Sequence, residues 1–195
     1  MKKIICCSVL AAMLMTSGCA GSRKYAYNYQ APPQAVSCSI IDSRPEQEKK
    51  GEVLSMLVSS SNYGIYRIGD SQLIPDRITF LKDKLEAAPG GKLQGKAVTV
   101  THFEILNNLQ KHLRSSVAFG AVGGIAGGLI YAGVTDDPTA LIDVNLEISV
   151  DGKPVGAHVA HGYNFGKWEG ATDEIVAREI HLAMNKAVEV VIGKI

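Results

Sequence analysis

The alternation of apolar and polar residues over 142–150 gives the clearest structural prediction of the chain. Isoleucine, valine or leucine occupies every second position, which is the period of a strand with one buried face. Asp151-Gly152 follows as a strong signal for a two-residue turn. The sequence therefore predicts an antiparallel hairpin. Its expected pairs are Val150 with Lys153, Ser149 with Pro154, Ile148 with Val155, Leu146 with Ala157 and Val144 with Val159.

Apolar residues recur with helical spacing in two other segments. Pro75 and Asp76 are typical of the start of the first helix, and the Pro-Gly-Gly run at 89–91 ends it. Thr172 is a good N-cap for the second helix, which runs nearly to Ile195. The residues expected on the buried faces are Ile78, Leu81, Leu85 and Ala88 in the first helix, and Val176, Ile180, Ala183, Met184, Ala187, Val188 and Val191 in the second.

Shorter apolar runs predict further strands at 36–41, 63–68 and 96–106. The run 53–61 fits either a helix or a strand. A change of apolar phase near Thr101 and His102 indicates a β-bulge or burial of both strand faces at that point. The order of elements predicts an α+β fold, in which a mostly antiparallel sheet carries two helices on one face.

The N-terminus has the pattern of an export signal. Lys2 and Lys3 precede an apolar run from 4 to 15, and small residues follow. A membrane-spanning helix needs about 20 apolar residues, so this shorter run is predicted to be removed rather than to stay in the membrane. We therefore expect residues 1–18 to be a cleaved signal peptide.

The sequence Thr-Ser-Gly-Cys at 16–19 resembles the lipobox of bacterial lipoproteins, although Thr16 stands where leucine is usual. The resemblance implies that Cys19 is acylated, with palmitate among the acyl groups, and becomes the first residue of the mature protein. Two or three acyl chains make such an anchor durable. Ala20 is not the aspartate that retains such lipoproteins at the inner membrane, so the resemblance implies the periplasmic face of the outer membrane.

Residues 19–35 are predicted to be the lipidated N-terminus and a flexible tether, followed by a periplasmic domain at 36–195. The tether contains Pro, Gln and Ser and could reach about 50 Å when extended. Its alternating tyrosines, Tyr25, Tyr27 and Tyr29, have two possible places. They either lie at the level of the lipid headgroups or pack on the domain.

An uncharged, glycine-rich segment covers residues 115–135. If it is helical, two neighbouring rows of glycine lie on one side: Gly120, Gly124 and Gly128 in one, Gly123 and Gly127 in the other. Such rows let another backbone approach closely, as in glycine-zipper helix association. Three interpretations stay open: packing on its own domain, contact with the membrane, or self-association.

Charge and cysteine content narrow the possible functions. Loss of residues 1–18 removes two of the 20 lysines and arginines and none of the 19 acidic residues. The remaining chain is nearly neutral, so a nucleic-acid partner is not expected. The same loss also removes two of the four cysteines. With Cys19 acylated, Cys38 has no disulfide partner and is predicted to be a small buried residue.

No motif for catalysis or for a cofactor stands out. His158 and His161 are three apart on a predicted strand, so they point to opposite faces and make a poor metal-binding pair. Asp42 and Arg44 are expected to form a local ion pair that fixes a turn, with a functional role left open. We expect no metal, no cofactor and no enzymatic activity. Trp168, the only tryptophan, is either a contact residue or a lid on the core.

With its leader, the order of elements resembles the small YajG-like and transport-auxiliary lipoproteins of the outer membrane. With no catalytic motif in the domain, we expect a non-enzymatic structural or interaction protein of the outer membrane. The resemblance implies an alternative, an accessory lipoprotein subunit of an ABC-type transporter or secretion complex. The sequence points to the glycine rows and Trp168 as the contact residues.

Overall fold

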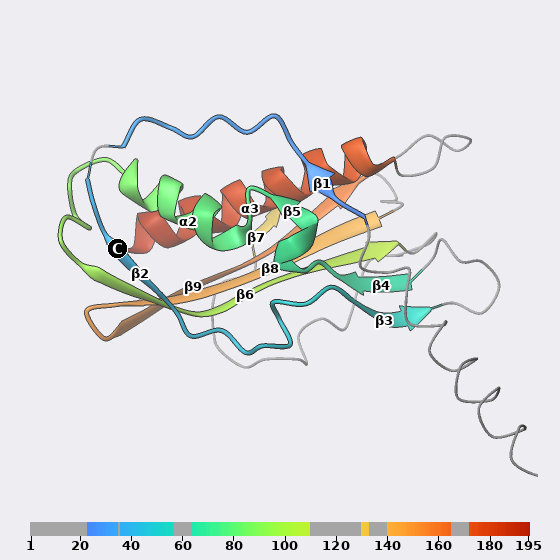
Figure 1. The fold of residues 1–195 in the computed structure, drawn as a ribbon, viewed down its shortest axis with the longest axis horizontal. Coiled ribbons are helices and arrows are strands. Elements are labelled where there is room, and N and C mark those ends of the chain that lie inside the picture. Colours follow the sequence, from blue (N-terminus) through green and yellow to red (C-terminus); the bar gives the residue numbers. More distant parts are fainter. Residues whose placement is uncertain (1–22, 35, 57–63, 110–129, 133–139, 165–171) are drawn as a thin grey trace, which may run out of the picture.

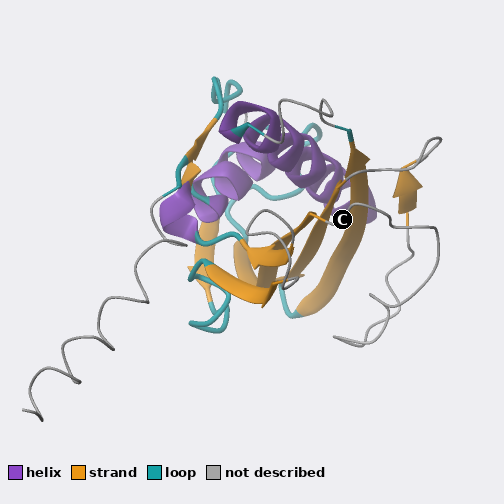
Figure 2. Cartoon of the chain, turned by 90° about the vertical axis from the view of Figure 1, so that its right-hand side faces the viewer, coloured by secondary structure: helices purple, strands orange, loops and turns teal. Residues whose placement is uncertain are grey.

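The fold is a seven-stranded sheet with two helices on one face (Figure 1 and Figure 2). A computed structural model describes residues 23–34, 36–56, 64–109, 130–132, 140–164 and 172–195. The elements in chain order are β1 (Tyr25–Ala26), β2 (Ser39–Asp42), β3 (Glu52–Met56), β4 (Gly64–Arg67), the 3-10 helix η1 (Asp70–Gln72), β5 (Leu73–Ile74), α2 (Arg77–Glu86), β6 (Ala97–Leu109), β7 (Ile130–Ala132), β8 (Ala140–Val150), β9 (Lys153–Tyr163) and α3 (Asp173–Lys194).

The strands of the sheet follow the order β3-β4-β6-β8-β9-β7, and β2 pairs with the start of β6. All pairings along this order are antiparallel except that of β7 with β9, and β2 is also parallel to β6. The predicted α+β class with a mostly antiparallel sheet is therefore confirmed. Of the segment 53–61, which fitted either helix or strand, the described residues 53–56 belong to β3, which pairs with β4.

The β8–β9 hairpin has the predicted register at every pair, from Val150 with Lys153 to Val144 with Val159. Asp151 and Gly152 both have positive φ, at 51° and 79°. This is the backbone that a two-residue turn needs to match the twist of its strands. The predicted irregularity in β6 is also present, because the register with β8 shifts between Val100 and His102.

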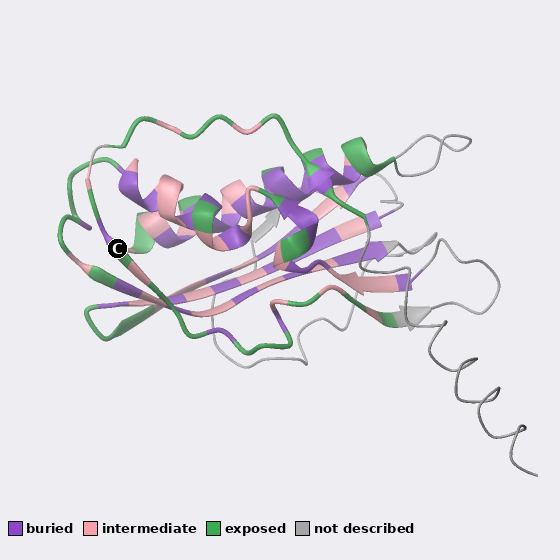
Figure 3. Cartoon of the chain, in the orientation of Figure 1, coloured by how far each residue is buried: buried purple, intermediate pink, exposed green. Residues whose placement is uncertain are grey.

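Both helices begin where their caps predict. The Asp76 carboxylate accepts hydrogen bonds from the backbone of Ile78 and Thr79, and the Thr172 hydroxyl accepts one from Ile175. The whole predicted stripe of α3 is buried against the sheet, and α2 buries its predicted residues except Ile78, which is half-buried (Figure 3). The core therefore lies between the helices and one face of the sheet.

Strand β2, predicted over 36–41, starts later than its apolar pattern predicts, at Ser39 instead of Val36. The backbone of Val36 donates to the Glu86 carbonyl, and that of Cys38 donates to the Glu86 carboxylate. These bonds hold the chain at the C-terminal end of α2 before it enters the sheet. Cys38 is buried, as predicted.

Residues 23–34, which we call the strap, lie along the helices where the sequence predicts a flexible tether (Figure 1). Tyr25 is 6% exposed, and β1 pairs in parallel with β5. The Tyr29 hydroxyl lies 3.3 Å from the Asp83 carboxylate. Of the two places open to the tyrosines, the structure has Tyr25 and Tyr29 packed on the domain, which thus begins before residue 36.

The predicted helical insertion at 115–135 differs from the structure at its C-terminal end. Residues 130–132 form strand β7, in which Ile130 is the partner of Val159 on β9. The edge of the sheet offers this segment backbone partners, which the sequence pattern alone does not reveal. The remainder of the insertion lies outside the described residues. In the described part of the chain, no helix is long and apolar enough to cross a membrane.

Candidate functional site

Six charged side chains gather where the bulge of β6 meets the loop after β2. We call this group the bulge cluster: Asp42, Arg44, Glu48, Asp70, Arg77 and His102. Both guanidinium side chains are fully buried, and Asp70 binds both of them. Because buried charges must be paired to be tolerated, this group is the first candidate for a functional site.

Arg44 lies between two carboxylates. Its Nε is 2.8 Å from Asp42 Oδ1, and its Nη2 is 2.8 Å from Asp70 Oδ2. Its hydrogen bonds lower the pKa of Asp42 to about 2. Burial lowers the pKa of Arg44, but its bonds to Asp42 and Asp70 outweigh that effect and raise it. The predicted ion pair of Asp42 and Arg44 is therefore confirmed, and it is joined to η1.

Arg77 binds three separate segments. Its Nε lies 2.5 Å from Asp70 Oδ1, its Nη1 donates to the Phe103 carbonyl, and its Nη2 donates to the Glu48 carbonyl. Sequence reasoning missed this residue. A cation in the first turn of a helix opposes the helix dipole, and that unfavourable position was the available signal for a specific partner.

Glu48 joins the loop to the bulge itself. One carboxylate oxygen lies 2.6 Å from His102 Nδ1, and the other accepts a hydrogen bond from the Phe103 backbone. The other ring nitrogen of His102 is 3.9 Å from Glu147. The hydrogen bond to Glu48, opposed by partial burial, raises the pKa of His102. A histidine held between carboxylates favours its charged form, which suits an ionic link better than a general base.

Beside the bulge cluster, the backbones of Gly51 and Gly69 pack closely against each other. A Cβ added at Gly69 would lie 2.2 Å from the backbone nitrogen of Gly51, so only glycine allows the loop and η1 to touch here. The arginine donors of the bulge cluster are directed to acceptors inside the fold. We therefore interpret the cluster as a clamp that holds residues 43–50 and η1 against the sheet.

A second group combines aromatic rings from the strap and both helices. His181 of α3 stacks on Tyr27 at 4.9 Å between ring centroids and meets Phe80 edge-on at 5.6 Å. Tyr29 lies 5.4 Å from Phe80, and the Lys84 ammonium lies 5.9 Å from the Tyr29 ring. His181 is 2% exposed, and neither ring nitrogen has a hydrogen bond of normal geometry. Burial, opposed by the backbone of Ile74 and supported by a smaller effect of Lys84, lowers the pKa of His181.

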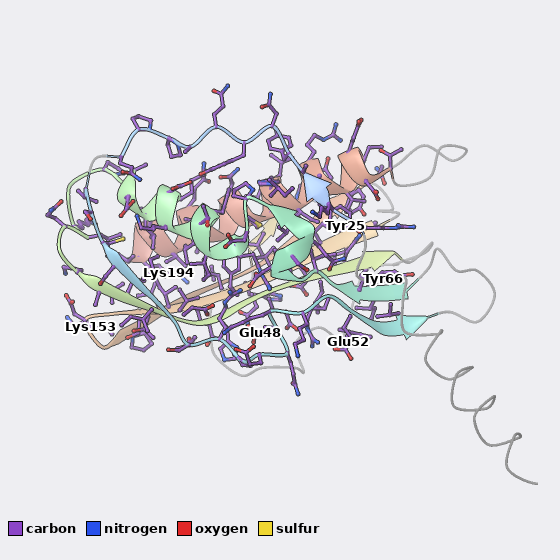
Figure 4. The ribbon with its side chains drawn as sticks, viewed as in Figure 1. Tyr25, Glu48, Glu52, Tyr66, Lys153 and Lys194 are labelled. Carbon is purple, nitrogen blue, oxygen red and sulfur yellow. The ribbon has the colours of Figure 1, made fainter. Side chains whose placement is uncertain are left out.

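The third group consists of tyrosines that lie at one end of the sheet. Tyr163 of β9 donates to the Asn107 side chain of β6 at 3.1 Å. Burial raises the pKa of Tyr163, and Tyr25 contributes to the rise. The pKa of Tyr25 is raised by burial and by Asp173, with a smaller effect of Tyr66, and is opposed by the charge and the hydrogen bond of Arg23. Tyr25 and Tyr66 lie at the same end in Figure 4, so β1 lies near the end of β6.

The remaining described histidines form pairs with acids. His158 bonds to Asp143, and His161 Nε2 lies 2.7 Å from Glu179 of α3. His161 faces the helices and His158 lies on the opposite face of the sheet, as predicted. Within the described residues, no three histidine, cysteine, aspartate or glutamate side chains are placed to hold a metal ion.

The residues that the sequence singled out for interaction lie outside the described ranges. They are Cys19, Gly120, Gly123, Gly124, Gly127, Gly128 and Trp168. The nearest described residues around the glycine rows are Leu109, opposite Gly64, and Ile130, opposite Val159. The chain therefore leaves the sheet at the end that carries Tyr25 and re-enters it at β7, beside the second half of β9.

Comparison of the chain with models of protein families, with curated proteins and with solved structures gave no match.

Proposed function

We propose that this protein is a lipid-anchored component of the cell envelope that acts by binding other components and not by catalysis. Its anchor is Cys19, at the periplasmic face of the outer membrane. The observation that carries the proposal is the order of the first 25 residues. A basic, apolar and small-residue leader ends in Cys19, and a buried residue of the domain, Tyr25, follows six positions later.

The short connection makes the anchor structurally meaningful. Six residues reach at most about 20 Å, against about 50 Å for the flexible tether that composition predicts. Because Tyr25 is fixed by burial and by the pairing of β1 with β5, an acylated Cys19 would hold the domain close to the bilayer. Such closeness suits a protein whose partner lies in or on the membrane.

The glycine-rich segment is the proposed contact element. Its N-terminal flank, Leu109, lies at the end of the sheet near Tyr25, and its C-terminal flank, Ile130, pairs with Val159 within β9. The chain therefore leaves the sheet on the side that the anchor would hold towards the lipid. An uncharged segment starting there is within reach of the bilayer, of a membrane protein or of a second copy.

The direct test is metabolic labelling with radioactive palmitate in a Gram-negative host, followed by membrane fractionation. We expect label on the wild-type protein and its recovery with the outer membrane. Cys19→Ser should lose the label and accumulate uncleaved. Cys38→Ala is the matched control, because it removes the other mature cysteine and should keep the label. Unlabelled wild-type protein would contradict the proposal.

The partner is approached by purification of the lipidated protein in detergent, with Cys19→Ser in parallel. Partners that depend on the anchor should be recovered only with the wild-type protein. Stoichiometric recovery of an ABC-type transporter or a secretion component would assign the protein to the accessory subunits. Recovery of the protein with itself alone would favour a self-contained structural role.

A further inference from the structure

We propose that one particular surface of the domain docks on anionic lipid headgroups. This surface, the anchor face, consists of Arg23 and Lys24, Tyr27 of the strap and Ile74 of β5. The inference rests on the proposed acylation of Cys19 and goes beyond it, because the anchor alone does not specify which side of the domain meets the membrane. The expected partner is the bilayer surface itself.

The pairing of β1 with β5 turns Tyr25 and Leu73 inward and leaves Ala26 and Ile74 exposed. Tyr25 points into the core, whereas its neighbours on both sides are exposed. Ile74 pairs with Ala26 and is 48% exposed, and Tyr27 is 44% exposed. They are two of the five large apolar side chains exposed among the described residues, and they lie next to one short ladder.

The chemistry of these side chains suits the interfacial zone of a bilayer. Tyrosine places an apolar ring and a polar hydroxyl at headgroup level, and isoleucine gains from leaving water. Arg23 and Lys24 are both exposed and offer cations to lipid phosphates, although the Arg23 side chain also hydrogen-bonds to Tyr25. Asp173, at the start of α3, also faces Tyr25 and offsets part of this charge. The electrostatic attraction therefore supplements the burial of Tyr27 and Ile74 and does not replace it.

The length of the connection excludes an orientation in which the domain stands on its opposite end. The 11 residues of β8 extend about 35 Å, at about 3.4 Å for each residue of an antiparallel strand. The Asp151-Gly152 turn ends that strand, and Tyr25 lies near its start at Ala140. Lys153 and Lys194 lie far from Tyr25 in Figure 4. With the strap in place, the reach of about 20 Å from Cys19 is too short for the domain to stand upright on that end, which would hold Tyr25 about 35 Å from the bilayer.

The test uses the full-length lipidated protein in vesicles of phosphatidylethanolamine and phosphatidylglycerol. Trp168→Phe first removes the only natural tryptophan. Ile74→Trp then provides a fluorescent probe on the anchor face, and Lys153→Trp is the matched control at the far end. We expect lipids brominated near the headgroup to quench the probe at position 74 and to leave the probe at position 153 unchanged.

The charged residues are tested in the same background. Replacing Arg23 or Lys24 with glutamine should lower the ratio of docked to undocked protein about fivefold for each cation, which corresponds to about 1 kcal/mol per basic residue at an anionic surface. The quenching at position 74 should fall accordingly, while the protein stays with the vesicles through its acyl chains. Undiminished quenching in vesicles of phosphatidylcholine alone would overturn the assignment of anionic headgroups.

Three further results would count against the inference, and they are distinguishable. Protein that stays with the vesicles but shows no quenching at position 74 overturns the anchor face and leaves the anchor intact. If acrylamide fails to quench the probe at position 74 only at high protein density, and brominated lipid does not quench it either, a second copy of the protein covers the anchor face. Protein that does not stay with the vesicles overturns the proposed anchor, and this inference with it.

Discussion

The rings of Tyr27 and His181 stack with their centroids 4.9 Å apart and their planes at 30°. The Tyr29 ring also stacks on His181, with its centroid 6.1 Å away and the planes at 24°. A histidine on the last helix thus holds two tyrosines of the strap, which lies more than 150 positions earlier in the chain. The connection between the domain and Cys19 stays short only while this contact and the β1–β5 pairing are kept.

The buried imidazole of His181 makes this contact sensitive to acid. Its pKa in the folded protein lies below the ordinary value of about 6.5, because burial, with a smaller effect of Lys84, outweighs the opposing effect of the Ile74 backbone. The folded state therefore binds fewer protons than the unfolded state. The stabilisation is complete above pH 6.5 and is lost as the pH falls from there through the lowered pKa of the folded state, by about 1.4 kcal/mol for each unit of pKa difference.

Urea denaturation at pH 7.5 and pH 5 measures this effect. We expect the wild-type protein to lose more stability on acidification than His181→Phe, which keeps an aromatic ring without a titratable group. Limited proteolysis of the strap should rise in parallel in the wild-type protein. An identical change of unfolding free energy in both proteins would contradict the prediction.

His158 should behave in the opposite sense. Its hydrogen bond to Asp143, opposed by partial burial, raises its pKa in the folded protein. Its contribution is complete below the ordinary value of about 6.5 and is lost as the pH rises through the raised folded pKa. We expect His158→Gln to be destabilised relative to wild type at pH 5.5 and to approach it at pH 9. A gap that is constant across this range would show that the pair contributes through packing alone.

Removal of Arg77 should be among the most damaging single substitutions. Its guanidinium is fully buried and satisfies Asp70 and the carbonyls of Phe103 and Glu48. Removing one partner of a buried charged network costs about 3–5 kcal/mol, because the groups left behind are unpaired. We expect Arg77→Ala to lower the urea midpoint accordingly. Arg77→Lys should recover little, since a single ammonium cannot reach three acceptors in different directions.

Lys50, an exposed cation of the same loop, provides the control for that measurement. Lys50→Ala should unfold close to the wild-type midpoint, since surface substitutions away from such networks have small effects. If both variants unfold alike, the bulge cluster does not hold the loop. A wild-type midpoint for Arg77→Ala would equally reject the role of clamp.

The parts of the fold that the sequence predicted depend on near neighbours. Asp151-Gly152 specifies its turn through its own backbone preferences, and Asp76 and Thr172 cap helices two or three residues away. The change of apolar phase near Thr101 and His102 likewise predicted the bulge at its position in β6. In each case the interaction that decides the structure lies within a few positions of the signal.

The missed features depend on partners far away in the chain. Arg77 finds Phe103 across 26 positions, and Tyr25 finds Leu73 across 48 positions. Nothing in the composition of the strap shows that a vacant edge at β5 is there to receive it. The clamp and the packing of the strap on the domain could therefore not be predicted from local sequence patterns.

The glycine rows are tested by Gly124→Leu combined with Gly128→Leu. If close backbone contact occurs there, two large side chains should abolish it and reduce self-association or membrane-dependent assembly. Crosslinking in cells and membrane fractionation measure the effect. If the segment makes its contacts outside its own domain, circular dichroism and the urea midpoint should stay near wild type. Unchanged crosslinking and fractionation would assign the segment a merely structural role.

Two glycines separate the effect of backbone conformation from that of space. A Cβ added at Gly152 or at Gly193 would meet no atom within 4 Å, but only Gly152 has a positive φ, at 79°. We expect Gly152→Ala to destabilise the hairpin by about 1 kcal/mol, because an L-residue is strained in that backbone region. Gly193→Ala should be neutral or stabilising by up to about 1 kcal/mol, because alanine favours helix. Urea denaturation of both variants checks the opposite signs, and a loss of stability for Gly193→Ala as large as that for Gly152→Ala would refute this explanation of the turn.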